Sequence, residues 1–256
     1  MRIKILYEDS NIIAIDKPSG IAVHADAKSK DKTITDWILQ KYPKTKNVGE
    51  PMGNIVRPGI VHRLDKETSG VLLLAKNKKA HEFLKNQFVT REIKKTYIAI
   101  VSGNMKNDRG VINKPIGRSP KDFRRYLSGR GARGEMREAI TEYNILKRFK
   151  AQCVQNFSSY DRPPGSTLGA KNFARIAPFT LLEVHPKTGR THQIRVHLKY
   201  LNHPIACDGL YNPGAPCPKG IKRMALHAKS IEFKNLKGET VKVESPLPKE
   251  FKRVLK

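Results

Sequence analysis

The chain has 256 residues, and its 50 Lys and Arg against 23 Asp and Glu give a formal net charge of +27 at pH 7. No run approaches the roughly 20 consecutive apolar residues that a membrane-spanning helix needs. Hydrophobic residues make up 38% of the chain, enough for a packed core beside a strongly basic surface. The composition therefore excludes a protein that spans a membrane with helices, and it argues against a collagen-like or wholly disordered chain.

The cysteines and the N-terminus bear on the compartment. Cys153, Cys207 and Cys217 are too few and too irregularly spaced for a disulfide framework or a zinc knuckle. Glu8 and Asp9 stand where a signal peptide would have its apolar stretch. We therefore expect a cytoplasmic protein.

The excess positive charge is unevenly distributed along the chain. Residues 1–75 carry a net charge of only +3, so most of the excess lies after residue 75. The region 118–137 is rich in basic residues and glycines, with Arg118, Lys121, Arg124, Arg125, Arg130, Arg133 and Arg137. A lysine-rich solvated surface would explain part of this charge but not its density. A polyanionic partner, most often a nucleic acid, is favoured.

Hydrophobic patterning predicts the secondary structure in chain order. Strands are expected at 11–16, 70–76, 94–102, 139–149, 179–185, 228–233 and 240–244, and helices at 33–42, 79–90 and 191–200. Asp31 or Thr33 could cap the first helix, and Thr191 the last. Residues 44–58 are predicted to form a loop. The pattern indicates one α+β domain over residues 1–256, with a mobile basic insertion around 118–137 and an extra loop around 150–178.

Three segments place polar residues next to apolar strands. The first, His62-Arg63-Leu64-Asp65-Lys66-Glu67-Thr68-Ser69-Gly70, leads directly into the apolar run 71–74. The second contains Lys-Thr-Tyr at 95–97, and the third runs from Gly189 to Leu198. A carboxylate and a guanidinium at the start of a buried strand are costly unless they are paired or used.

These segments resemble the RluA-type family of pseudouridine synthases. The resemblance includes Lys17-Pro18-Ser19-Gly20 and extends to 204–208 and 226–228, so it covers nearly the whole chain. It starts at the catalytic domain, without the small N-terminal RNA-binding domain of some relatives, and leaves 153–175 without a counterpart. It implies an α+β catalytic domain built on a mixed, mostly antiparallel β-sheet flanked by helices.

The resemblance implies isomerisation of uridine to pseudouridine in RNA, a redox-neutral reaction that needs no metal or other cofactor. It places the nucleophile on Asp65, whose attack on the sugar or on the base is left open. Arg195 matches the cation that keeps this carboxylate ionised, and Tyr97 matches the aromatic residue that packs on the flipped base and could move a proton.

Substrate binding is assigned in the same way. Arg63 corresponds to a residue that displaces the target base, and Leu198 is expected to line the uracil pocket. His62, which precedes Arg63 in its motif, is also expected to bind substrate. Arg124, Arg125, Arg130 and Arg133 of the basic region are expected to contact phosphates. The partner would be ribosomal or transfer RNA, with no membrane and no metal, and the protein is expected to be a monomer.

Simpler interpretations stand beside these assignments. Asp65 could cap a turn, Arg195 could be a solvated helix residue, and Tyr97 could belong to the core. The spacing of His62, His192 and His197 matches no common metal site. A non-catalytic RNA-binding protein of ribosome assembly is the alternative from another class, although such a protein would not need a buried carboxylate in a basic cleft.

Overall fold

The computed structural model describes residues 1–25, 31–50, 57–129, 131–154 and 175–255. The chain divides into two compact units, Met1–Tyr97 with His227–Pro246 and Ile98–Leu226 with Leu247–Lys256. It passes from the first unit to the second within strand β4 and returns within strand β12. That the two units act as one catalytic domain stays a prediction.

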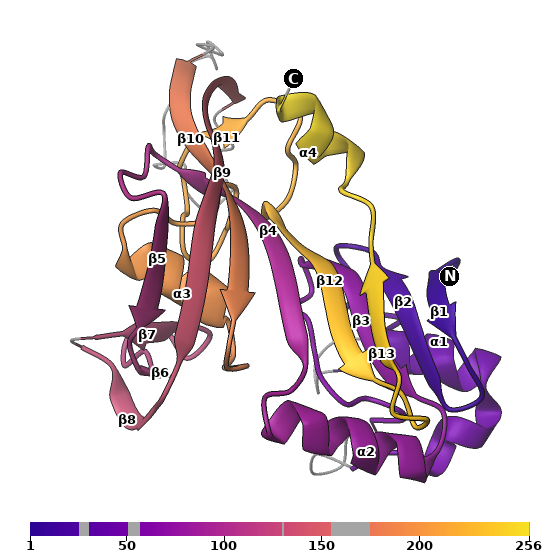
Figure 1. Ribbon diagram of the computed structural model, residues 1–256. Helices are drawn as coiled ribbons and strands as arrows, with labels where there is room; N and C mark the ends of the chain where they lie inside the picture. The colour runs from indigo at the N-terminus through magenta and orange to yellow at the C-terminus, as the bar shows by residue number, and fades with distance from the viewer. Residues whose placement is uncertain (26–30, 51–56, 130, 155–174, 256) are drawn as a thin grey trace. The chain divides into compact units, whose positions relative to one another are not determined.

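The first unit is a mixed sheet with helices. Its elements are β1 (Lys4–Glu8), β2 (Ile12–Lys17), α1 (Ile34–Lys41), the 3₁₀-helix η1 (Pro43–Asn47), β3 (Ser69–Ala75), α2 (Lys78–Val89), the first half of β4 (Lys94–Ser102), β12 (Leu226–Lys234) and β13 (Thr240–Glu244). Strands β1, β2 and β3 pair antiparallel, β12 runs parallel to β3, and β13 pairs antiparallel with β12. Figure 1 shows these strands beside one another, with α2 along one end.

Alternation along β2 and β3 gives this sheet two buried faces. Ile13 and Ile15 point to one face and pack with α1 residues such as Trp37. Ile12 and Ala14 point to the other face and pack with α2 residues such as Leu84. Because successive side chains of a strand alternate between faces, a strand covered on both sides reads as a continuous apolar run.

Both helices of this unit begin at a side-chain cap. Thr33 and Asp36 form a reciprocal capping box at the start of α1, and Asn77 accepts a hydrogen bond from the Ala80 N–H at the start of α2. Of the two residues predicted as caps for the first helix, Thr33 is the one used.

The second unit is built around two long antiparallel strands. Its elements are β5 (Arg109–Asn113), β6 (Ile116–Arg118), β7 (Tyr126–Ser128), β8 (Arg133–Arg137), β9 (Ile140–Val154), β10 (Arg175–Pro186), α3 (Gln193–Tyr200), β11 (Cys217–Pro218) and α4 (Lys249–Val254). Strands β9 and β10 pair antiparallel over most of their length, and β5 and β11 both pair with β9. Helix α3 lies against β9 and β10.

The described residues of the basic region form strands where a loop around 118–137 was predicted, and the expected mobility of this insertion stays a prediction. Its described residues form a three-stranded sheet in the order β7-β6-β8. Ile116 and Tyr126 anchor this sheet by packing with Val196 of α3 and with Tyr211. Apolar contacts with residues far along the chain therefore order a segment whose own sequence shows mainly arginine and glycine.

Most of the predicted elements are confirmed with small shifts at their ends. The strands at 94–102 and 240–244 have the predicted bounds, and the helix at 79–90 is α2. The helix predicted from Thr191 begins at Gln193, after His192 rather than a Thr191 cap.

Other expectations were wrong. The predicted loop at 44–58 overlaps η1, and the predicted loop at 150–178 overlaps the end of β9, which reaches Val154, and the start of β10, which begins at Arg175. Residues 155–174 of that predicted loop, residues 51–56 of the other, and Arg130 lie outside the described residues. Among the described residues, no helix is both long and apolar enough to cross a membrane.

Candidate active site

Asp65 lies in the loop that leads into β3, and the Lys-Pro-Ser-Gly segment braces that loop. The side chain of Lys17 is completely buried, and its ammonium donates hydrogen bonds to the carbonyls of Pro18, Ile21 and Lys66 at 2.8–3.0 Å. A buried ammonium is tolerated only when its donors are satisfied. Lys17 therefore ties the residue after Asp65 to the end of β2.

Further contacts between the two segments fix the same loop. The backbone N–H of Gly20 donates to the Lys66 carbonyl at 2.9 Å, and the Ser19 hydroxyl donates to the Glu67 carbonyl at 2.7 Å. Asp65 itself is half-buried, and its carbonyl accepts from the Thr68 N–H across the turn. The Asp65 loop is thus held by backbone contacts of its neighbours, which is the preorganisation that a reactive group requires.

The Ser-Gly pair that ends the motif serves the sheet. The Ser69 hydroxyl is hydrogen-bonded to Nδ1 of His227 at 2.9 Å, and both residues are buried. Gly70 has φ +111°, and a Cβ at this position would overlap the Ala228 carbonyl. Only glycine allows β3 and β12 to come this close at the point where the Asp65 loop enters the sheet.

Tyr97 and Asp65 belong to the same electrostatic environment. Tyr97 is half-buried and packs against the cluster on the α1 face of the sheet. Burial raises the pKa of its phenol, and the negative charge of Asp65 raises it further. The phenol therefore stays protonated at neutral pH and can donate a proton or a hydrogen bond.

Lys95 lies two residues before Tyr97 on β4. Burial lowers the pKa of Lys95 to about 8. Burial of the ring, the larger cause, and the charge of Lys95 together lower the pKa of His62 to about 3. The first two motifs thus place a carboxylate (Asp65), a phenol (Tyr97), an ammonium (Lys95) and a neutral imidazole (His62) in the first unit.

The contacts of His62 are structural. Its Nε2 accepts a hydrogen bond from the Leu73 N–H at 2.9 Å, and the ring stacks on Phe88 at 4.8 Å between centroids. These contacts tie the motif to β3 and α2, while contact of His62 with substrate stays a prediction. Arg63, by contrast, is exposed, as a residue that displaces a base would have to be.

Arg195 in α3 is paired with a buried aspartate of its own unit. Its Nε and Nη2 donate to the two carboxylate oxygens of Asp208 at 2.7 and 2.8 Å, and Asp208 is only 1% exposed. One Asp208 oxygen also accepts from the backbone N–H groups of Leu210 and Tyr211, and the guanidinium lies 4.9 Å from the Tyr211 ring centre. This two-pronged, charge-assisted pairing fixes the orientation of the guanidinium.

The rest of the 189–198 segment holds α3 in place. Gln193 donates to the Ile140 carbonyl and to the Thr141 hydroxyl, and His197 is hydrogen-bonded to Thr141 and to the Lys114 carbonyl. Leu198 is completely buried. The histidine therefore serves the core, and the role of Leu198 in a uracil pocket stays a prediction.

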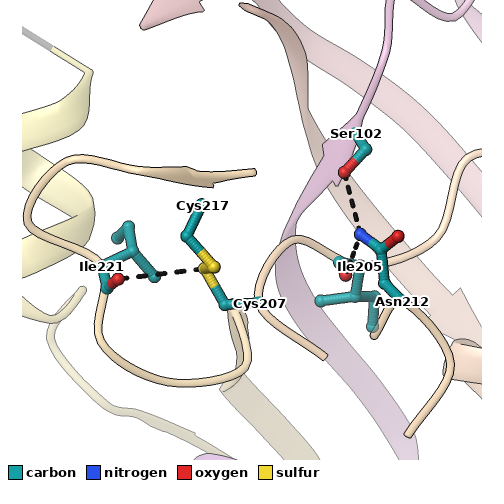
Figure 2. Close-up of a disulfide and its surroundings, with 6 residues drawn as sticks. All are labelled: Ser102, Ile205, Cys207, Asn212, Cys217 and Ile221. Atoms are coloured by element: carbon teal, nitrogen blue, oxygen red, sulfur yellow. Dashed lines mark hydrogen bonds between the residues drawn. A yellow bond between two sulfur atoms is a disulfide. The ribbon is translucent and has the colours of Figure 1, made fainter. Parts of the chain in front are cut away.

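The loop that carries Asp208 is closed by a disulfide between Cys207 and Cys217 (Figure 2). In the same loop, the Asn212 amide donates to the Ser102 hydroxyl and to the Ile205 carbonyl (Figure 2). The sequence argued against a disulfide framework or a zinc knuckle and did not predict this single bridge. The cytoplasmic location that we inferred partly from the cysteines loses that support and stays a prediction.

The basic region presents its charge on the three-stranded sheet. Arg124 and Arg133 are exposed and Arg125 is half-buried. Asp122 pairs with Arg124 at 2.9 Å and lies 3.5 Å from Arg125, so part of this charge is compensated. The contact of these arginines with phosphates stays a prediction.

Two further residues of the motifs have contacts to which sequence reasoning gave no role. Asp208 stands in the 204–208 segment and Lys95 precedes Tyr97 in the Lys-Thr-Tyr motif; the signal was their place within the resemblance. Within the described part of the chain, no group of three or more His, Cys, Asp or Glu side chains is arranged to hold a metal ion.

Comparison with known proteins identifies the family. The family described as RNA pseudouridylate synthase matches residues 11–200. Ribosomal large subunit pseudouridine synthase D of Borreliella burgdorferi is 40% identical over 250 residues, which cover 97% of this chain and 66% of that protein. The RNA pseudouridine synthase YlyB of Bacillus subtilis, itself termed uncharacterized, is 34% identical over 256 residues, 100% of this chain and 72% of that protein.

Solved structures have the same fold. Human RNA Pseudouridylate Synthase Domain Containing 4 aligns with a TM-score of 0.66 and 25% identity over 98% of this chain and 91% of that one. Human RNA Pseudouridylate Synthase Domain Containing 1 aligns with a TM-score of 0.68 and 23% identity over 96% of this chain and 84% of that one. The chain belongs to the RNA pseudouridylate synthase family, the group that its motifs resemble.

Proposed function

We propose that this protein isomerises specific uridines of large-subunit ribosomal RNA to pseudouridine, with Asp65 as the nucleophile. The reaction breaks the bond between the ribose and a ring nitrogen and rejoins the ribose to a ring carbon, so atoms and electrons balance without a cofactor. The observation that carries the proposal is the placement of Asp65 in a loop that the buried Lys17 braces at the start of β3, with Tyr97 of β4 in the same unit and its pKa raised by burial and by the charge of Asp65. The names of relatives that act on the large ribosomal subunit favour ribosomal RNA.

Each residue of the motif has a chemical task in this proposal. Asp65 attacks the target nucleotide, and the proposal covers attack on either the sugar or the base. Arg195, held by Asp208, keeps the Asp65 carboxylate ionised when the bound base excludes water. Tyr97 packs on the base and moves a proton during isomerisation.

The target base must leave its stack before any of these groups can reach it. Extruding a base costs about a few kcal/mol. The exposed Arg63 would fill the space that the base leaves, with His62 beside it, and Leu198 would contact the uracil. Phosphate contacts of the basic sheet would offset the cost of unstacking.

A binding protein without catalysis is the alternative, and the Lys17 brace argues against it. Three hydrogen bonds of one buried ammonium hold the loop that carries Asp65. RNA binding through surface arginines alone would not require such precise placement of a carboxylate.

Mapping pseudouridines in total RNA from cells with and without this protein tests the proposal. We expect one or more pseudouridines of large-subunit ribosomal RNA to disappear without the protein and to return with the wild type. Loss confined to transfer RNA would replace the proposed substrate, and an unchanged map would overturn the proposed activity.

A further inference from the structure

A lysine-lined cavity lies in the first unit, apart from the residues assigned to catalysis. It has a volume of about 620 Å³, and among its lining residues are Lys41, Tyr42, Lys44, Lys76, Asn77 and Lys78. Of the described residues that line it, none is acidic. These residues come from the end of α1, from η1 and from the start of α2. We call this feature the lysine groove.

One lysine of the lysine groove, Lys76, is engaged in contacts that hold the lining of the groove together. The Lys76 ammonium donates to Glu8 at 2.9 Å and to the Asp9 carbonyl at 2.8 Å, and it lies 5.0 Å from the centre of the Tyr42 ring. The Tyr42 hydroxyl donates to the same Glu8 carboxylate at 2.8 Å. Lys76 thus pairs with Glu8, and its bond holds the pKa of Glu8 below its usual value.

The other lysines of the groove leave a net positive charge. In the part of the chain that the structure describes, neither Lys44 nor Lys78 forms an ion pair, and both side chains are exposed. Lys41 lies over the Tyr42 ring at 5.8 Å. Lys41, Lys44 and Lys78 thus line one concave surface whose described lining contains no acidic residue, while the charge of Lys41 also acts on the neighbouring Glu8. An anion would stabilise the remaining positive charge.

Helix α2 adds to this unbalanced charge. Its first turn contains Lys78 and Lys79 and no acidic residue. The N-terminus of a helix carries partial positive charge and favours anions, so lysines there are unfavourable in the isolated protein. An anion in the groove would relieve this repulsion.

We propose that the lysine groove binds the phosphate backbone of RNA, as a second contact surface apart from the basic three-stranded sheet. The inference rests on the proposed function in taking RNA as the substrate. The cavity volume lies within the range of roughly 300–1,000 Å³ for ligand sites, so the groove can admit a nucleotide-sized part of a chain. Because phosphates carry no sequence information, the groove would position RNA rather than select the uridine.

A salt titration with matched variants tests the proposal. The groove variant is Lys44→Gln with Lys78→Gln. The control is Lys4→Gln with Lys237→Gln, which removes the same charge from exposed positions of the same unit. Affinity for a fluorescent hairpin of large-subunit ribosomal RNA is measured by anisotropy over a series of salt concentrations. Pseudouridine formation at saturating RNA is measured in parallel.

In the groove variant, the negative slope of log affinity against log salt should become shallower by about 0.7–0.9 for each phosphate that the variant no longer binds. The control should leave the slope near that of the wild type, and all three proteins should turn over saturating RNA at similar rates. A groove variant with the slope of the control would overturn the proposal.

A second measurement separates RNA from a small anion. If inorganic phosphate raises the melting temperature of the wild type and the control but not of the groove variant, while the RNA slopes agree, the groove is a small-anion site and the proposal is wrong. If the groove variant shows the smaller salt dependence while the wild type forms no pseudouridine, the proposed function is overturned and the groove inference stands.

Discussion

Two aspartates of the motifs, Asp65 and Asp208, occupy opposite kinds of environment. Asp208 is 1% exposed, and its oxygens accept hydrogen bonds from Arg195 and from two backbone N–H groups. Asp65 is half-buried in a loop that is fixed through the carbonyls of Lys66 and Glu67.

The difference between the two environments suits the two carboxylates to different roles. A buried carboxylate bonded at both oxygens stabilises a guanidinium and has little capacity left for chemistry. Backbone contacts of its neighbours position Asp65, and the residue remains partly exposed. This contrast fits the proposal that Asp65 carries the chemistry and that Asp208 positions Arg195.

The largest expected effect is that of Asp65→Asn. The amide is nearly isosteric but is not a nucleophile, so pseudouridine formation should be abolished while the melting temperature and RNA affinity stay near wild type. Single-turnover assays with binding measurements check this. Measurable product from pure Asp65→Asn protein would remove Asp65 from the mechanism.

Asp208→Asn should act through Arg195. Removing one partner of a buried ion pair leaves an uncompensated charge and costs roughly 3–5 kcal/mol of unfolding free energy. Turnover by Asp208→Asn should fall as turnover by Arg195→Ala does, and Asp208→Glu should recover part of the lost turnover.

Asp122→Asn is the matched control, because it breaks an exposed Asp–Arg pair of the same unit. Urea denaturation should show little change for it, since solvent screens surface pairs. Equal destabilisation by Asp208→Asn and Asp122→Asn would contradict the distinction between the two environments.

Lys95→Met tests the electrostatics beside Asp65. The pKa of Lys95 is lowered from 10.5 to about 8 in the folded protein. Between these values the unfolded chain binds the proton and the folded protein does not, so wild-type stability should rise with pH in this window. The unfolding free energy of Lys95→Met, relative to that of the wild type, should be greatest below pH 8 and should fall towards about pH 10. A constant difference in unfolding free energy from pH 7 to about pH 10 would show that Lys95 is not desolvated.

The smallest expected effects concern the basic sheet. Arg118→Ala with Arg133→Ala should reduce the magnitude of the slope of log RNA affinity against log salt by about 0.7–0.9 for each phosphate that is no longer bound. Arg124→Ala with Arg125→Ala should lower it less, because Asp122 already compensates part of that charge. An unchanged slope in both variants would mean that this sheet does not contact RNA.

Local signals predicted the elements whose patterns are complete within a few residues. Thr33, one of the two caps predicted for the first helix, defines the start of α1, and hydrophobic patterning predicted the bounds of β4 and β13. The short strands β6, β7 and β8 have no such pattern. Packing of Ile116 and Tyr126 with Val196 and Tyr211 orders them, and the local sequence does not contain that information.

The candidate site was predicted to a similar degree. The motifs propose Asp65, Tyr97 and Arg195 as site residues, roles that stay predictions, and they do not show that Asp208 holds Arg195 or that Lys17 braces the Asp65 loop. Lys17 and Lys66 are 49 positions apart, and their contact depends on the return of the chain beside β2. Such contacts between distant segments follow from the fold rather than from the spacing of a motif.

The central claim, cofactor-free isomerisation of uridine by Asp65, is tested most directly by incubating the purified protein with a transcript of large-subunit ribosomal RNA and no other reagent. Chromatography of the digested nucleosides should reveal pseudouridine, an isomer with the mass of uridine, in the wild-type sample and none in the Asp65→Asn sample. Absence of the isomer in the wild-type sample, or equal amounts in both, would contradict the account.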